Sequence, residues 1–463
     1  MDEQQLQTAV TEAAERLGVP GVAVGVFLDG AEHYAVHGVT SVENPLQVDT
    51  GTLFQFGSTG KTYTATAIMI LVERGLIELD APVRRYVPEF RLKDEETARK
   101  VTVLQLLNHT AGWAGDLMDR TGSGDDALAR YVENMAGLEQ VTPLGSTVSY
   151  NNASLSLAGR IIEKVTGDTF EQAMKELLFD PLGLSRSFFA ENDVMTRRFV
   201  VGHNQHADGH VTVARPWALP RGARPAGGIT SDIRDLIRWA RFTLGDGCAA
   251  DGTRLLSEHL LRSMTQPTAE SPGNAVGDAV GIAWWLRDAG GVRLVSHGGN
   301  TIGQDSGFDL VPERNFGIAT VTNCSQNGGK FNEDMRRWAL QNYLGIVERD
   351  PDPITLSEPE LRRYAGRYET LAAIADVAVS DGGLVVTVEI KPEVLAQIHE
   401  SGEEEPDQPP FPVGLLPGPG DRYVVTAGPA KGMKGYFARS EQGEVTAVHL
   451  GGRLATRVAA GEG

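Results

Sequence analysis

A serine and a lysine stand three residues apart in the segment Phe56-Gly57-Ser58-Thr59-Gly60-Lys61. At the start of a helix this spacing puts both side chains on one face, one turn apart, so that they can form a hydrogen bond. The Ser58 hydroxyl becomes a nucleophile when a base takes its proton. Lys61 can be that base where burial or nearby cations depress its pKa. The pair indicates acyl-transfer chemistry, although Ser-x-x-Lys alone is more often a capping serine followed by an exposed lysine.

The tripeptide Gly60-Lys61-Thr62 also looks like the end of a nucleotide-binding phosphate loop. Such a loop needs a glycine five residues before Gly60, where this sequence has Gln55. The formal charge of −19 argues against nucleic acid as a partner, because phosphate binding needs a basic face. Neither nucleotide nor nucleic-acid binding is therefore expected.

A second segment with chemical potential is Ser149-Tyr150-Asn151-Asn152, ahead of a helical pattern. A tyrosine beside a lysine ammonium can shuttle a proton, and the amide of Asn152 can orient the lysine and hold a substrate carbonyl. Taken alone, Tyr150 is more often a half-buried structural tyrosine.

A third segment, Ser296-His297-Gly298-Gly299-Asn300, follows a predicted strand. Glycines at a strand edge let a substrate backbone come close. His297 is placed to hydrogen-bond a substrate carboxylate or carbonyl, although in isolation it is a loop histidine. Only in combination do the three segments predict one site.

In this order and spacing the three segments resemble the signatures of the serine β-lactamase and penicillin-recognising superfamily, in its class C-like branch. The resemblance covers roughly residues 5 to 345. Further stretches that match the family are Arg74-Gly75-Leu76-Ile77-Glu78-Leu79-Asp80, Val103-Leu104-Gln105-Leu106-Leu107-Asn108-His109-Thr110-Ala111-Gly112, Asp180-Pro181-Leu182-Gly183-Leu184 and Pro225-Ala226-Gly227-Gly228-Ile229.

The resemblance implies a role for each matching residue. Ser58 is similar to the acylated nucleophile, and Lys61 and Tyr150 resemble the proton-transfer pair, with Asn152 supporting Lys61 and the substrate. Which of Lys61 and Tyr150 is the base stays open, as it does for related enzymes.

The family's oxyanion hole is similar to the backbone N–H groups of Ser58 and Asn300, with Gly298 and Gly299 beside them at the substrate-binding edge. His109 belongs to a family stretch, but we expect it to pack structurally. The mechanism implied by the resemblance requires no metal and no cofactor.

One departure bears on the substrate. Class C β-lactamases carry Lys-Thr-Gly where this chain has His297-Gly298-Gly299, and an imidazole is a weaker anchor for a carboxylate than a lysine. The His-x-Gly form is similar to D-aminopeptidases, some esterases and penicillin-binding-protein-type thioesterases. The expected function is a serine acyl-hydrolase that cleaves a peptide, amide or ester bond. The alternatives are a peptidyl cyclase or transacylase, a β-lactamase and, outside enzymes, a peptide- or cell-wall-fragment-binding protein.

The elements that position these residues can be predicted from hydrophobic spacing. Strands first, a helical middle and late strands indicate an α/β (α+β) fold with an antiparallel sheet and helices on its faces. The expected strands are 22–28, 291–296 and 316–321, and the expected helices are 58–74 and 154–165.

The chain is expected to divide near the stiff linker Arg349-Asp350-Pro351-Asp352-Pro353. We predict a serine hydrolase domain over 1–348, a linker over 349–358 and a small antiparallel β-barrel over 359–463. The barrel begins with a segment, 361–369, that is similar to the opening of lipocalin-like domains.

Within that barrel, a proline-rich segment with Glu403-Glu404-Glu405 lies between Ile398 and Asp421. It predicts a disordered loop or, alternatively, a loop that reaches over the active site and trims substrate choice.

Other features predict little chemistry. The segment from His203 to His210 is expected to be a solvated hairpin rather than a metal site. Cys248 and Cys324 are expected to be buried as small apolar side chains rather than paired. The polar start of the chain and the lack of an apolar run of about 18 residues favour a cytoplasmic protein without a membrane segment. The expected partner is a small-molecule or peptide substrate.

Overall fold

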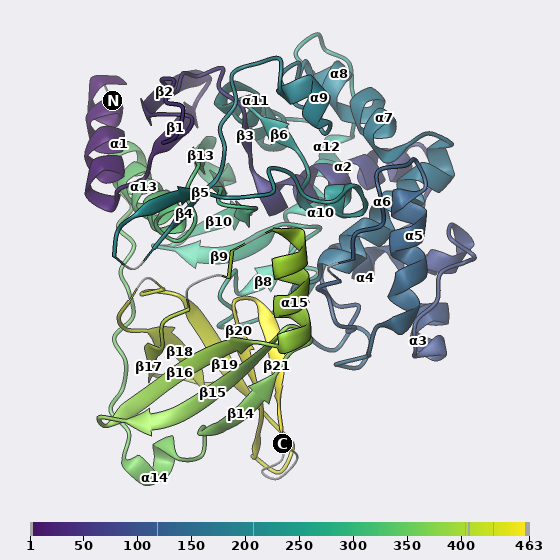
Figure 1. The fold of residues 1–463 in the computed structure, drawn as a ribbon. Coiled ribbons are helices and arrows are strands. Elements are labelled where there is room, and N and C mark those ends of the chain that lie inside the picture. Colours follow the sequence, from purple (N-terminus) through teal and green to yellow (C-terminus); the bar gives the residue numbers. More distant parts are fainter. Residues whose placement is uncertain are drawn as a thin grey trace.

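The computed structural model describes residues 3–117, 119–206, 208–402, 404–405, 408–428 and 430–458. Within them, a nine-stranded antiparallel sheet runs in the order β2-β1-β13-β12-β10-β9-β8-β7, with β11 paired to β12 (Figure 1). Its strands are β1 (Gly21–Leu28), β2 (Ala31–Gly38), β7 (Ala269–Glu270), β8 (Ala279–Val280), β9 (Trp285–Ala289), β10 (Val292–Ser296), β11 (Gly299–Asn300), β12 (Asp305–Val311) and β13 (Phe316–Thr322).

The first hairpin confirms the prediction for 22–28. β1 is apolar and buried almost throughout, as expected for a strand covered on both faces. Asp29 and Gly30 both have positive φ, 49° and 90°, which is the geometry of a two-residue type I′ turn. The predicted strands over 291–296 and 316–321 are found as β10 and β13.

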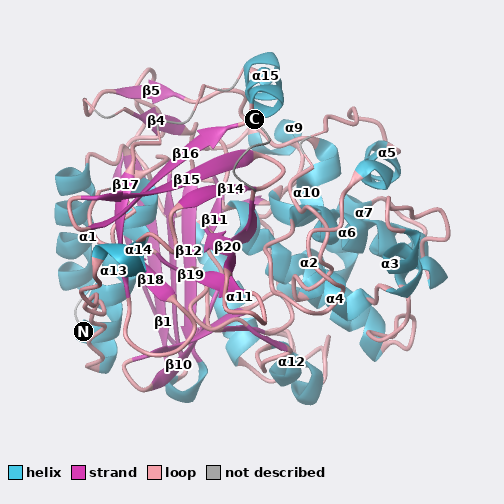
Figure 2. Ribbon diagram, turned by 90° about the horizontal axis from the view of Figure 1, so that it is seen from below, coloured by secondary structure: helices cyan, strands magenta, loops and turns pink. Residues whose placement is uncertain are grey.

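Helices cover both faces of this sheet (Figure 2). α1 (Glu3–Leu17) and α13 (Asn327–Leu344) pack together on one face. α11 (Ile233–Leu244) packs on the other, against β1 and β13. It approaches so closely that a Cβ at Gly25 would lie 2.5 Å from Ile237, so β1 requires glycine there.

The helical part beside the sheet contains the two helices that the sequence predicted. α2 (Gly60–Glu73) follows a short 3₁₀ turn over Gly57–Thr59 and is buried on all sides through Leu71. α6 (Asn152–Thr166) ends on Gly167 in the left-handed conformation. The remaining helices here are α3 (Glu95–Lys100), α4 (Val103–Leu107), α5 (Ala127–Asn134), α7 (Phe170–Met174), α8 (Asp180–Leu182), α9 (Glu191–Val194), α10 (Arg224–Gly227) and α12 (Glu258–Met264).

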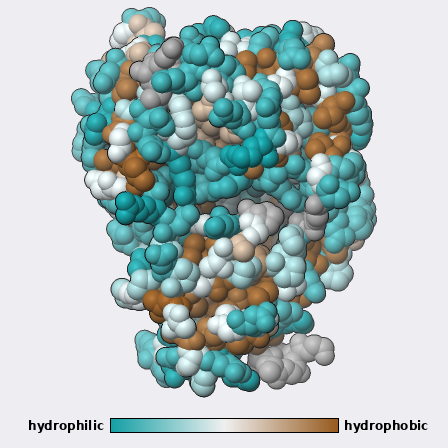
Figure 3. Space-filling view, turned by 90° about the vertical axis from the view of Figure 1, so that its left-hand side faces the viewer, coloured by the Kyte–Doolittle hydropathy of each residue, from teal (hydrophilic) through white to brown (hydrophobic). Residues whose placement is uncertain are grey.

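The C-terminal strands form a closed antiparallel barrel, β14-β15-β16-β17-β18-β19-β20-β21, as predicted. Its interior is filled by side chains that include Tyr368, Tyr423 and Phe437. Further apolar side chains gather on the outside of the barrel, in the lower half of Figure 3. The strands are β14 (Gly366–Glu369), β15 (Ala373–Ser380), β16 (Gly383–Ile390), β17 (Phe411–Leu415), β18 (Arg422–Val425), β19 (Lys434–Arg439), β20 (Val445–Leu450) and β21 (Arg453–Arg457), with helices α14 (Glu358–Leu361) and α15 (Pro392–Ser401).

The disordered-loop prediction for the proline-rich segment is wrong over residues 398–401 and 411–415, which form regular secondary structure. The segment begins inside α15 and contains β17, which pairs with β16 and β18. Regular hydrogen bonding of the backbone outweighs the acidic, proline-rich composition there. Glu403, Pro406 and Asp407 lie outside the described residues.

Two smaller predictions need correction. The hairpin of β4 (His203–Gln205) and β5 (Val211–Val213) forms as predicted, but His203 is fully buried rather than solvated, because both ring nitrogens find backbone partners. Cys248 and Cys324 are free, yet only Cys324 is buried. A second short ladder joins β3 (Phe54–Gln55) to β6 (Thr230–Ser231) just before the 3₁₀ turn of Ser58.

In the part of the chain that the structure describes, no helix is long and apolar enough to cross a membrane. Over the same residues, histidine, cysteine and carboxylate side chains form no cluster arranged to hold a metal ion.

Candidate active site

Two glycines bring the main chain of β11 against the main chain of Ser58. Gly57 has a φ of 54°, and a Cβ there would lie 2.4 Å from the carbonyl oxygen of Asn300. A Cβ at Gly299 would lie 2.5 Å from the backbone nitrogen of Ser58. Any larger residue at either position would push β11 away from the serine. Ser58 and Asn300 are therefore close neighbours, as an oxyanion hole between their N–H groups requires.

Lys61 lies directly beneath Ser58. Its Nζ is 2.9 Å from Ser58 Oγ and donates to the carbonyl oxygen of Ala226 at 2.6 Å. The side chain is fully buried on α2. Burial lowers the pKa of Lys61 well below its usual range, the nearby cation of Arg453 lowers it further, and Asp116 acts in the opposite direction. The arrangement favours a neutral amine that can accept the serine proton.

Tyr150 forms one wall beside Ser58. Its ring lies against His109 and Trp285, and Lys61 Nζ is 4.9 Å from its centroid. Burial raises the pKa of Tyr150 above its usual range, whereas a hydrogen bond with Ser58 and the charge of Arg453 act to lower it. The balance favours a protonated phenol, which is a proton donor rather than a resident base.

Asn152 makes a different contact from the one expected. It begins α6, and its Nδ2 donates to Asp116 Oδ1 at 2.8 Å, whereas the polar contacts of Lys61 go to Ser58 and Ala226. The carboxylate draws the amide because charge-assisted hydrogen bonds are the stronger ones. Asn152 therefore supports the Asp116 carboxylate, and its expected contact with a substrate stays a prediction.

Arg453 is a site residue that the sequence did not reveal. It follows the turn of the β20–β21 hairpin, where Gly451 and Gly452 both have positive φ. Its guanidinium donates two hydrogen bonds to Asp116, one of them 2.9 Å from Nη2 to Oδ1. Its Cζ lies 5.0 Å from the ring centroid of Tyr150. The only available signal was the Gly-Gly turn itself, which predicts a hairpin but not its neighbour 337 residues away.

The same hairpin holds the backbone around Tyr150. The N–H of Tyr150 donates to the carbonyl oxygen of Gly452 at 2.8 Å, and the N–H of Leu454 donates to Ser149 Oγ at 3.3 Å. The barrel therefore supplies both a side chain and a main-chain contact to the site.

His297 lies on the opposite side of the site and is 1% exposed. Its Nδ1 is 2.6 Å from the carbonyl oxygen of Gly298, so this nitrogen carries the proton and Nε2 has the free lone pair. Burial is the main cause that lowers the pKa of His297, to about 3. In this neutral state Nε2 accepts hydrogen bonds and does not donate them. The expected contact of His297 with a substrate carboxylate or carbonyl stays a prediction.

His109 packs structurally, as expected. Its Nδ1 accepts the N–H of Asn151 at 3.1 Å, and its ring stacks on Trp285 with an interplanar angle of 8°. Burial lowers its pKa well below the usual range. It therefore supports the segment that carries Tyr150 without facing Ser58.

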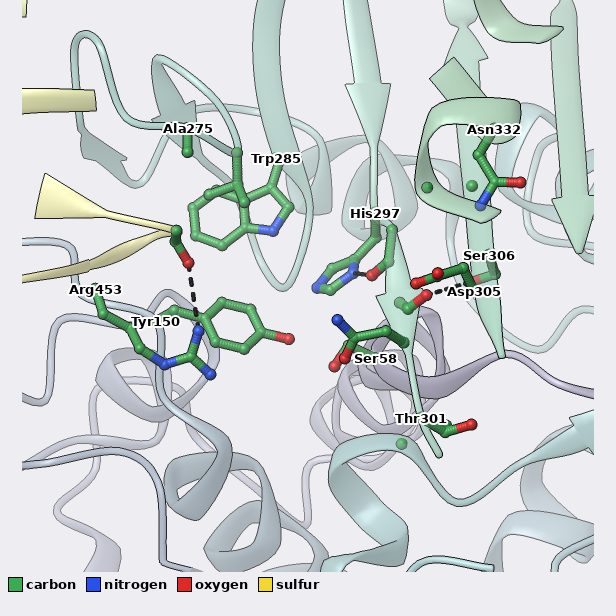
Figure 4. Close-up of a pocket in the computed structure, with 18 of the residues that line it drawn as sticks. Ser58, Tyr150, Ala275, Trp285, His297, Thr301, Asp305, Ser306, Asn332 and Arg453 are labelled. Carbon is green, nitrogen blue, oxygen red and sulfur yellow. Dashed lines mark hydrogen bonds between the residues drawn. The ribbon is translucent and has the colours of Figure 1, made fainter. Parts of the chain in front are cut away.

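A cleft of about 970 Å³ joins these groups (Figure 4). Every predicted site residue lines it except Lys61, which reaches Ser58 from below. Its other walls come from the helical part, from α13 and from the barrel. The wall from the helical part includes Leu117, Tyr131, Leu219 and Ala223. The wall from α13 includes Lys330, Asn332 and Arg337, and the wall from the barrel includes Val394, Ile398, Lys431 and Arg453.

Comparisons with known proteins agree with this architecture. Residues 6–343 match the Beta-lactamase family. Penicillin-binding protein 4 of Amycolatopsis lactamdurans is 37% identical over 364 residues, which cover 76% of this chain and 93% of that protein.

Two solved structures show the same fold. The crystal structure of SurE is 24% identical, with a TM-score of 0.74 over 98% of this chain and 99% of that one. The D-amino acid amidase from Ochrobactrum anthropi SV3 is 24% identical, with a TM-score of 0.62 over 74% of this chain and 99% of the amidase. Together with the sheet, the helical part and the Ser58 cleft, the matches place this chain in the β-lactamase family of serine hydrolases and penicillin-binding proteins.

Proposed function

We propose that the protein is a serine acyl-hydrolase that forms an acyl-enzyme on Ser58 and cleaves a peptide, amide or ester bond. The observation that carries the proposal is the buried Lys61 Nζ, 2.9 Å from Ser58 Oγ, with a pKa lowered by burial. A lysine held neutral in this way meets the requirement for activating a serine hydroxyl.

In the proposed acylation, Lys61 takes the proton of Ser58 while Oγ attacks the substrate carbonyl. The negative charge that develops on the carbonyl oxygen is held by the N–H groups of Ser58 and Asn300. Tyr150 then gives its proton to the leaving group and receives one from Lys61. Arg453 stabilises the transient phenolate, because its cation faces the ring. In hydrolysis of the acyl-enzyme, the same pair takes a proton from the attacking water and gives one to Ser58 Oγ.

The cleft supports a peptide-sized donor. Its volume of about 970 Å³ lies at the upper end of small-molecule sites. A cleft of this volume, with one wall from the barrel, also supports the second candidate function, which is transfer of the acyl group to an amine as a transacylase or peptidyl cyclase. A β-lactamase function is less well supported, since the neutral His297 offers no cation to a penicillin carboxylate.

Intact-mass spectrometry tests the proposal. Wild-type protein and Ser58→Ala are each exposed to a p-nitrophenyl ester, a penicillin and a D-amino-acid amide, with and without an added amine. We expect an acyl adduct on the wild type and none on Ser58→Ala. Ser156→Ala is the matched control, because this buried serine lines the same cleft on α6, whereas the hydrogen bonds of Lys61 go to Ser58 and Ala226; it should keep the adduct.

An adduct that persists in Ser58→Ala would contradict the assignment of the nucleophile. No adduct from any donor on folded wild-type protein would favour a peptide-binding role instead. The products formed with and without the amine separate hydrolysis from acyl transfer.

A further inference from the structure

One polar atom in the cleft is left unused by the proposed acylation. His297 Nε2 is buried and has no hydrogen-bond partner among the described residues. The Nδ1 bond to Gly298 fixes the ring so that this free nitrogen faces the side of the pocket on which Tyr150 lies (Figure 4). A buried acceptor without a partner costs free energy, so a donor supplied by a ligand would be bound there favourably.

The position of this acceptor relative to Ser58 and Tyr150 indicates which ligand atom would meet it. The ring centroids of His297 and Tyr150 are 6.3 Å apart, and both residues line the cleft with Ser58. A nucleophile that attacks an acyl group on Ser58 must lie near the Lys61–Tyr150 pair, which takes its proton. An atom placed there comes between the hydroxyl of Tyr150 and the imidazole of His297.

We propose that His297 Nε2 accepts the hydrogen that the acyl acceptor keeps, and so selects primary amines and water over secondary amines and alcohols. The inference rests on the proposed acyl-enzyme at Ser58. In this contact His297 accepts a hydrogen bond from the substrate, whereas the carboxylate anchor that its place in the sequence suggests would donate one.

The transfer step accounts for the hydrogens. The amine nitrogen attacks the acyl carbon, and one of its two protons passes to the Lys61–Tyr150 pair as the C–N bond forms. The C–Oγ bond then breaks, and Ser58 Oγ takes a proton from the same pair. The second N–H stays on the product amide and is the one that Nε2 accepts. Water likewise has a second hydrogen, whereas an alcohol or an N-methylated amine has none left.

The neutral state of the ring agrees with a contact that holds rather than takes a proton. Because the pKa of His297 is lowered to about 3, the imidazole does not compete with Lys61 as a base. A lysine in its place would present only donors to the incoming nucleophile.

The test measures how one acyl-enzyme divides between acceptors. A p-nitrophenyl ester donor is mixed with glycinamide or with its N-methyl counterpart, sarcosinamide, and the amide and acid products are quantified by liquid chromatography and mass spectrometry. Hydrolysis serves as the internal reference in each mixture, because the ratio does not depend on the rate of acylation or on the amount of folded protein.

We expect wild-type protein to prefer glycinamide to sarcosinamide by about tenfold more than His297→Leu does, which corresponds to one hydrogen bond. His297→Gln, whose side-chain carbonyl can accept the same hydrogen, should keep most of the preference. The control is Thr301→Val, which removes another hydroxyl that lines the cleft and has no partner among the described residues; its ratio should match that of the wild type.

An equal preference in wild type and His297→Leu would overturn the inference and assign any discrimination to size alone. If His297→Leu does not form an acyl-enzyme, the wild type still decides, since equal yields from the two amines would also overturn it. Either result leaves acylation of Ser58 intact, whereas failure of the proposed function shows as the absence of any adduct on the wild type.

Discussion

The two sides of the Ser58 cleft hold their functional groups by different means. On one side, α2 places Ser58 and Lys61 through the geometry of a single helical turn. On the other, the β20–β21 hairpin of the barrel places Arg453 by contacts with Asp116 and with the segment that carries Tyr150. The first side depends on local spacing and the second on long-range packing. The comparison teaches that the site is finished by a part of the fold that carries no catalytic signature.

The largest effect should come from the local side. Lys61→Met keeps the length of the side chain but removes the base, so we expect the acylation rate to fall by about 10²–10⁴-fold. Stopped-flow release of p-nitrophenol measures it. Lys175→Met, on a surface lysine that pairs with Asp180, should change the rate little. A loss below tenfold in Lys61→Met would place the base elsewhere.

Loss of the long-range contact of Arg453 should lower the stability of the protein. Arg453→Met leaves the Asp116 carboxylate without its cation, and we expect unfolding free energy to fall by about 2–3 kcal/mol. This is less than for a fully buried pair, since 35% of the Arg453 side chain is exposed to the cleft. Urea titration followed by circular dichroism measures the change.

The barrel offers a matched control for that variant. Arg367 makes the same two-bond contact with Asp376, but on the exposed outer surface of the barrel. Arg367→Met should cost less than about 1 kcal/mol. Equal losses in the two variants would mean that the Arg453 contact is an ordinary surface pair.

A pH profile sharpens the comparison, because both sides act on Lys61. Arg453 lowers the pKa of Lys61 and Asp116 raises it. Activity that needs neutral Lys61 is lost as pH falls through this pKa. The acidic limb of kcat/KM should therefore move to higher pH in Arg453→Met and to lower pH in Asp116→Asn. Shifts in the same direction, or none, would identify another group as the base.

The smallest effect should come from α15, at the edge of the barrel. Ile398 lines the cleft, so Ile398→Ser should raise KM about threefold for donors with long acyl chains and leave p-nitrophenyl acetate unchanged. His399→Ser is the control, because that neighbouring residue is exposed and does not line the cleft. Equal changes for short and long donors would show that α15 acts on the fold and not on the substrate.

Much of the fold could be predicted because its signals are local. The buried run of β1, the Asp29-Gly30 turn and the left-handed Gly167 each depend on neighbouring residues. α15 carries local signals as well, with Pro392 at its start and Gly402 in the left-handed conformation after its end. Only the last residues of α15 fall in the segment 398–421, for which the acidic, proline-rich composition predicts a disordered loop.

The site was predictable in its residue types but not in its electrostatics. Ser58, Lys61 and Tyr150 meet as their spacing and order indicated. Which ring nitrogen of His297 carries the proton depends on a hydrogen bond to Gly298. The partner of Asn152 is Asp116, and no sequence pattern predicts that contact. Tautomers and ion pairs follow from burial, and burial is decided by packing of the whole chain.

The position of Arg453 in the chain also sets the order in which the working site comes into being. Arg453 is synthesised 395 residues after Ser58. At translation rates of about 5–20 residues per second, roughly 20–80 s separate the two. During that interval a ribosome-bound chain already holds the serine and its lysine, while β21 has yet to close the barrel. The contacts of Arg453 with Asp116 and Tyr150 can form only once that last strand is in place, so they are the last part of the cleft to be assembled.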